Sequence, residues 1–141
     1  MITFVCGELC SGKTIYSQSL ANLTNGVYIE VGDVVRELKQ TNDRKVLQDS
    51  KTLSKAIIAN LQLFISKQLP KDCIISGVRQ KEILKAFPDA TLMWIECPRK
   101  ERKTRYTKRA RQGDTMSFRE AEKGDKKLGI LKVKKYILKH K

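Results

Sequence analysis

The sequence predicts an α/β domain with three layers, in which helices cover both faces of a parallel sheet of about five strands. Short apolar runs alternate along the chain with longer stretches of helical spacing, and this order is typical of parallel sheets. A length of 141 residues suits one domain, and 40% hydrophobic with 31% charged residues is enough to build a folded core. We therefore expect a single domain over residues 1–141, with right-handed connections between strands.

Five short runs account for the expected strands. Two of them are nearly continuous apolar, as strands covered on both faces tend to be, and the last one is the weakest candidate. In chain order the expected strands are 2–6, 27–31, 73–76, 91–96 and 136–138.

Helical spacing fills the segments between these runs. In the longest segment, apolar residues from Leu53 to Leu69 recur at three- and four-residue steps, and Pro70 ends the helix. The expected helices are 13–22, 33–40, 51–69, 80–86 and 98–112.

A phosphate-binding motif follows the first expected strand, because GELCSGKT fits the pattern G-x-x-x-x-G-K-[ST] in full. Gly7 turns the chain out of the strand, and Gly12 lets backbone N–H groups wrap a phosphate at the positive end of the next helix. Lys13 then reaches the β- and γ-phosphates, and the Thr14 hydroxyl is placed to bind Mg²⁺. The alternative is a glycine-rich turn with a solvated lysine.

The motif therefore predicts a P-loop that binds ATP and Mg²⁺. Within it, Lys13 is the expected catalytic residue, because it contacts the phosphate that is transferred. The expected ATP-binding residues are Gly7, Glu8, Leu9, Cys10, Ser11, Gly12, Lys13 and Thr14.

The second expected strand leads into GDVVR at 32–36, which resembles the G-D-[ML]-[LI]-R segment of adenylate kinases and related nucleoside monophosphate kinases. The resemblance implies that Arg36 binds the phosphate of the acceptor and that Asp33 belongs to the acceptor site and lies near the Mg²⁺-bound phosphates. A guanidinium suits this task because it offers two parallel donors to phosphate oxygens. The alternative is that Asp33 is a helix N-terminal charge and Arg36 a solvated side chain.

The third expected strand ends in SGVR at 76–79, which resembles the D-G-x-[PR] segment of the same kinases. The resemblance implies that Gly77 and Arg79 belong to the acceptor site, although Gly77 also fits a simple strand end. Ser76 stands where many P-loop kinases have an aspartate that supports the metal. This difference leaves the Mg²⁺ contact to Thr14 and Asp33, and it also leaves open an inactive nucleotide binder.

A basic helix follows the fourth expected strand and resembles the lid of these kinases. Arg102, Arg105 and Arg109 share one face, and Arg111 lies just beyond. A lid supplies positive charge to the transferring phosphoryl group and excludes water. The resemblance implies a short helical lid at about 99–125, with Arg105, Arg109 and Arg111 as catalytic residues; solvated or RNA-facing arginines are the alternative. Residues 118–130 also resemble the final segment of small archaeal and phage kinases of the adenylate kinase and dephospho-CoA kinase type.

Charge is concentrated in the last third of the chain. The net charge is +14, and residues 98–141 hold 17 basic and 5 acidic side chains. This surplus favours a polyanionic partner, which could be a nucleotide, nucleic acid or acidic lipid. Aromatic residues for base stacking are few there, so nucleic acid is the less favoured partner.

Targeting and metal signals are weak. No apolar run is long enough to span a membrane, and the N-terminus does not resemble a secretory signal, so we expect a cytoplasmic protein without membrane contact. The four cysteines form no CxxC pair and are expected to be reduced and largely buried.

The combined motifs predict ATP-dependent phosphoryl transfer to a nucleoside or deoxynucleoside 5′-monophosphate, which gives the diphosphate and ADP. Small nucleotides are thus the expected partners. Two alternatives stay open: a kinase of the same fold whose acceptor is a hydroxyl group, as in dephospho-CoA or a nucleoside, and a nucleotide-dependent nucleic-acid-binding protein.

Overall fold

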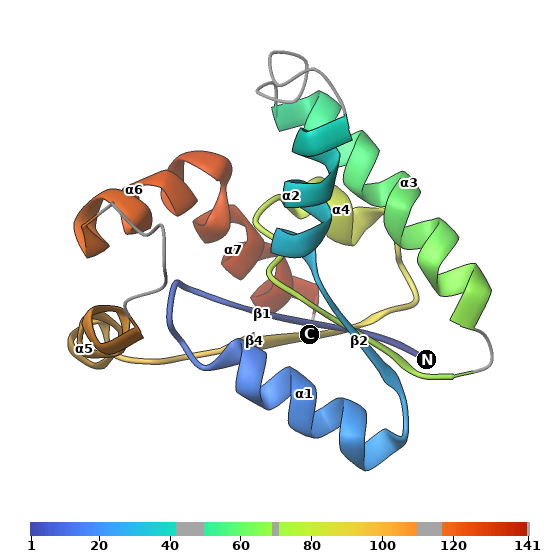
Figure 1. Ribbon diagram of the computed structural model, residues 1–141, viewed down its shortest axis with the longest axis horizontal. Helices are drawn as coiled ribbons and strands as arrows, with labels where there is room; N and C mark the ends of the chain where they lie inside the picture. The colour runs from blue at the N-terminus through green and yellow to red at the C-terminus, as the bar shows by residue number, and fades with distance from the viewer. Residues whose placement is uncertain (42–49, 69–70, 110–116, 141) are drawn as a thin grey trace.

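The computed structural model describes residues 1–41, 50–68, 71–109 and 117–140 (Figure 1). Strands and helices alternate through most of this part of the chain. The elements are β1 (Ile2–Gly7), α1 (Lys13–Thr24), β2 (Val27–Glu30), α2 (Val31–Thr41), α3 (Ser50–Gln68), β3 (Cys73–Ser76), α4 (Lys81–Lys85), β4 (Thr91–Ile95), α5 (Arg99–Arg109), α6 (Phe118–Leu128) and α7 (Ile130–His140).

The described strands form one parallel sheet in the order β2-β3-β1-β4. β1 is central, with Phe4 level with Ile75 of β3 and Leu92 of β4. The expected α/β class and parallel sheet are confirmed, with four strands in place of about five.

Helices cover both faces of the sheet (Figure 1). On one face, Phe4 and Ile75 pack in a large core with residues of α2, α3, α4 and α7. On the other face, Val5 and Ile74 pack against Ala21 of α1. Successive β1 residues point to opposite faces, so a nearly continuous apolar run is what a strand in the middle layer requires.

The prediction of a strand at 136–138 is wrong, because this segment belongs to α7. Ile130, Val133 and Ile137 are buried at three- and four-residue steps, which is the spacing of one helix face. Three apolar residues alone fit either a strand or a helix, and only the longer pattern separates them. α7 therefore packs against β4 and β1 as part of a helical layer.

All four cysteines are free thiols, and Cys6 and Cys73 are buried. Cys10 and Cys97 are half-buried. No helix among the described residues combines the length and the apolar character needed to cross a membrane.

Candidate nucleotide-binding site

The segment 7–14 bends tightly between β1 and α1. A side chain at Gly7 would place its Cβ 2.4 Å from the Ser11 hydroxyl oxygen and 2.9 Å from the Ile95 carbonyl oxygen, so only glycine fits there. The backbone N–H of Ser11 donates to the Glu8 carbonyl at 3.1 Å and closes the turn. Gly12 then enters α1 with φ of 94°, a conformation that favours glycine.

The N-terminus of α1 is open to an anion. No side chain caps it, so its first N–H groups keep their capacity to donate. The positive end of the helix dipole adds to the attraction for a phosphate. These features fit a triphosphate, and the Thr14 hydroxyl in the first turn is of a type that binds Mg²⁺.

Lys13 folds back over the loop. Its Nζ donates to the Glu8 carbonyl at 3.4 Å. Burial lowers the pKa of Lys13, and the positive charge of Arg79 lowers it further, whereas Asp125 acts in the opposite direction. The negative charge of a bound phosphate would stabilise the protonated form of Lys13.

A cavity of about 910 Å³ lies at the carboxyl ends of the strands. This is the edge of a parallel sheet at which α/β proteins bind ligands. Of the site residues predicted from the sequence, those that line it are Leu9, Cys10, Ser11, Gly12, Lys13, Thr14, Arg36, Gly77, Arg79, Arg105 and Arg109. Gly7, Glu8 and Asp33 do not line it, and Arg111 lies outside the described residues.

The two expected acceptor arginines differ in how firmly they are held. Arg79 donates from Nε to Asp125 at 2.7 Å and from Nη1 to the Gly77 carbonyl at 3.3 Å. Arg36 is exposed and pairs with Asp33, one turn away on α2. Asp33 therefore faces its helix neighbour, and the cavity is reached by Arg36 itself.

Ser76 is fully buried, and its hydroxyl shares a hydrogen bond of 3.0 Å with that of Tyr28. Sequence reasoning missed a carboxylate nearby, Glu30, which lines the cavity at the end of β2. A Cβ added at Gly32 would lie 3.5 Å from a Glu30 carboxylate oxygen and 3.6 Å from Arg36 Nη1, so both side chains face this point. The sequence did carry a signal for Glu30, because a carboxylate at the carboxyl end of a parallel strand lies where α/β proteins bind ligands.

Helix α5 lies against the loop through its arginines. Arg105 donates from Nη1 to the Cys10 carbonyl at 3.3 Å, and Arg109 stacks over the Tyr106 ring at 5.2 Å. Positive charge from α5 thus reaches the same cavity as Lys13. α5 and α6 pack together, with Tyr106 edge-on to Phe118 at 5.7 Å.

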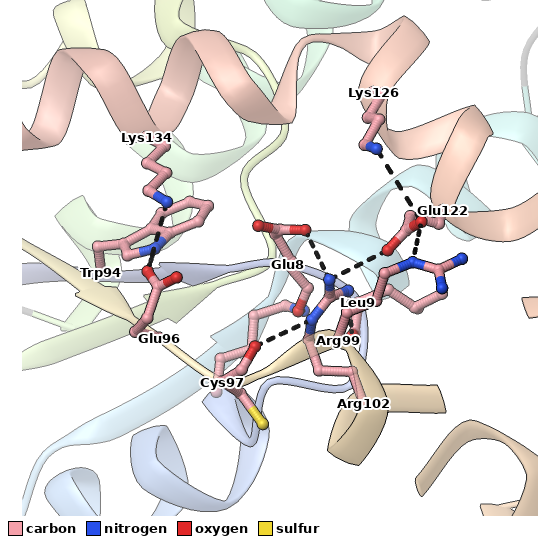
Figure 2. A network of polar contacts seen from close by, with 11 residues as sticks. Glu8, Leu9, Trp94, Glu96, Cys97, Arg99, Arg102, Glu122, Lys126 and Lys134 are labelled. Carbon is pink, nitrogen blue, oxygen red and sulfur yellow. Dashed lines mark hydrogen bonds and ion pairs between the residues drawn. The ribbon is translucent and has the colours of Figure 1, made fainter. Parts of the chain in front are cut away.

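Arg102 is different, because it is only 4% exposed. Figure 2 shows its guanidinium between Glu8 and Glu122. Its Nη2 lies 2.9 Å from a Glu8 carboxylate oxygen and 3.0 Å from Glu122 Oε2. Its Nε donates to the Cys97 carbonyl at 3.1 Å and its Nη1 to the Leu9 carbonyl at 3.4 Å. One guanidinium therefore joins the phosphate-binding loop to α5 and α6.

Glu122 is the carboxylate at the centre of this network. Arg99, whose side chain is exposed, donates from Nε to Glu122 at 3.0 Å, as Figure 2 shows. Burial acts to raise the pKa of Glu122, but the hydrogen bonds and charges of Arg99 and Arg102 outweigh burial and lower it. Glu122 is therefore an ionised structural partner of Arg102.

A glycine-bounded loop between the first strand and first helix of a parallel sheet, with arginines of a later helix against it, defines a P-loop domain with the fold of P-loop kinases. A family model described as AAA domain matches residues 3–125, and the chain belongs to this family. No curated protein matches the chain.

Solved structures share the fold at low sequence identity. The Pnkp1/Rnl/Hen1 RNA repair complex matches 96% of this chain with a TM-score of 0.65 and 15% identity, and this chain spans 45% of the matched one. A shikimate kinase from Aquifex aeolicus matches with a TM-score of 0.55 and 16% identity, covering 99% of this chain and 95% of that one. A sugar kinase from a Janibacter species matches with a TM-score of 0.52 and 16% identity, covering 88% and 76%.

Proposed function

We propose that the chain transfers the γ-phosphoryl group of ATP to a nucleoside or deoxynucleoside 5′-monophosphate, which yields ADP and the diphosphate. The observation that carries this proposal is that Lys13 with its loop, and the arginines Arg36 and Arg79, line one cavity. Donor and acceptor phosphates bound by these groups would meet in that cavity. Holding two reactants together supplies much of the catalysis in phosphoryl transfer.

Each residue then has a stated role. Lys13 and the loop N–H groups bind the donor phosphates, and Arg36 and Arg79 bind the acceptor phosphate. Thr14 is the proposed Mg²⁺ ligand; Asp33 is the second candidate, with its carboxylate now paired to Arg36. Mg²⁺ would neutralise charge on the transferred group, and the proposed catalytic arginines Arg105, Arg109 and Arg111 would add to this effect.

The proposal is tested by measuring ADP formation with ATP and Mg²⁺ over a panel of ribo- and deoxyribonucleoside monophosphates. The panel also contains nucleosides and dephospho-CoA, and Lys13→Ala serves as the blank. We expect one or a few monophosphates to stimulate turnover and Lys13→Ala to abolish it while the circular dichroism stays native. Stimulation by none of the monophosphates would contradict the proposal.

The acceptor role of the two arginines has its own test. Arg36→Ala and Arg79→Ala are expected to raise the KM for the acceptor more than the KM for ATP. Arg119→Ala, an exposed arginine on α6 outside the cavity, is the matched control and should change neither. A larger rise in the KM for ATP would assign the arginines to the donor.

A second candidate function is favoured by Glu30. A hydroxyl acceptor needs a base near the reacting oxygen, whereas a phosphate acceptor is already anionic. Glu30 is a carboxylate in the cavity that could accept that proton. If the acceptor is a hydroxyl group, Glu30→Gln should lower kcat by about 10² to 10⁴-fold; with a monophosphate acceptor the loss should be far smaller.

A further inference from the structure

A second cavity of about 750 Å³ lies beside the first one. Its walls come from α3, α4, α6, α7 and the turn between α6 and α7. Six of its lining residues are lysines, and the only carboxylate that lines it in the described part of the chain is Glu82. The lysines are Lys51, Lys55, Lys81, Lys126, Lys127 and Lys132.

The positive charge of this cavity is only partly compensated. Lys126 approaches Glu122 at 4.0 Å, but Glu122 already contacts two arginines. Lys55, Lys127 and Lys132 line the cavity, are exposed and lie on three different helices. Lysines gathered from separate helices around one hollow attract an anion more strongly than the same lysines spread over a convex face.

The two cavities are contiguous. Gln80 and Leu128 line both of them, and Gln80 directly follows Arg79, the proposed acceptor ligand. A ligand whose end lies at the first cavity can therefore continue into the second. Leu128 and Leu131, which are 40% and 44% exposed, together with Ile58 give the second cavity apolar surface beside its lysines.

We propose that the second cavity binds the phosphates of a short single-stranded nucleic acid whose terminal nucleotide lies at the acceptor side of the first cavity. This inference rests on the proposed function, because that function places a nucleotide beside Arg36 and Arg79. A mononucleotide would leave Lys55, Lys127 and Lys132, which line only the second cavity, without a phosphate. A strand carries one phosphate per linkage, and its sugars and bases would meet the apolar surface next to those phosphates.

The inference is tested by fluorescence anisotropy with a 5′-phosphorylated hexamer of deoxythymidylate that is labelled at its 3′ end. The test variant combines Lys55→Gln, Lys127→Gln and Lys132→Gln. The matched control combines Lys67→Gln, Lys85→Gln and Lys135→Gln, which removes three exposed lysines that line neither cavity. Both variants lose the same charge, so a difference between them reports position.

We expect the test variant to bind the hexamer about tenfold more weakly than the control, or worse. The slope of log affinity against log salt should fall by about 0.7 for each lost phosphate contact, hence by about 2. Unlabelled deoxythymidine monophosphate should compete with the hexamer at high concentration. Equal binding by the two variants, or displacement by a six-phosphate inorganic polyphosphate as effective as by unlabelled hexamer, would overturn the inference.

Failure of this inference differs from failure of the proposed function. ADP formation with monophosphates should be the same in the wild type, the test variant and the control, because no lysine replaced in either variant lines the first cavity. Lysine-dependent hexamer binding without any monophosphate turnover would overturn the proposed function alone. Monophosphate turnover with hexamer binding that ignores the three lysines would overturn the inference alone.

Discussion

Replacing Arg102 with alanine removes a guanidinium that contacts two carboxylates and two backbone carbonyls. Breaking a buried ion pair from one side costs about 3–5 kcal/mol, because the other charge stays buried. Arg99 and Lys126 still contact Glu122 after the change, so we expect the lower end, about 3 kcal/mol. This is a large part of the about 5–15 kcal/mol that stabilises a typical domain.

The assay is urea unfolding followed by circular dichroism and by the fluorescence of Trp94, the only tryptophan. Arg99→Ala is the control, because Arg99 touches the same carboxylate but its side chain is 55% exposed; its loss should be about 1 kcal/mol or less. The double variant with Arg102→Ala and Glu122→Gln should lose less free energy of unfolding than the two single variants lose together. A loss below about 1 kcal/mol for Arg102→Ala, or strict additivity, would refute the reasoning.

Three further predictions concern ionisation. The pKa of Glu122 is lowered in the fold, so the carboxylate stabilises the protein fully above its ordinary pKa of 4.5 and less as the pH falls below that value. The Glu122→Gln variant should therefore lose less free energy of unfolding than the wild type when the pH is lowered over that range. The pKa of Lys13 lies below its ordinary value of 10.5, so ATP affinity should decline at alkaline pH, and calorimetry should find a flatter pH profile for Lys13→Arg. Burial raises the pKa of Cys6 to about 12, so this thiol should resist alkylation near neutral pH. Cys10, which lines the cavity, should be alkylated, and ATP should protect it; mass spectrometry measures both. Alkylation of Cys10 at the same rate with and without ATP would count against binding of ATP at the loop.

The fold follows from local patterns over most of the chain. The strand at 73–76 coincides with β3, and the loop motif lies between β1 and α1 as expected, because both signals are contiguous in the sequence. The strand prediction for 136–138 is wrong because the signal that decides this segment extends beyond it. Its three apolar residues carry no period of their own, and the wider spacing from Ile130 to Ile137 decides for a helix.

The site is only partly local. Arg36 and Arg79 line the same cavity as Lys13, and their binding of an acceptor phosphate stays a prediction. The partners of Arg102 could not be read from local motifs, because the Leu9 carbonyl is 93 residues away in sequence and Glu122 is 20 away. In the sequence Arg102 looks like one more arginine of a basic helix. Its burial distinguishes it from Arg105 and Arg109 on the same helix face, and burial is set by the fold.

The burial of Arg102 also bears on how the domain would move around a bound nucleotide. The first turns of α5 are fastened to the phosphate-binding loop at Glu8 and Leu9, so they cannot swing away without exposing a severed charge network. Opening and closing over a nucleotide would then have to begin beyond Arg102, toward Arg109. The contact between Arg102 and the loop forms once, when the chain folds, and does not have to form again each time a nucleotide binds.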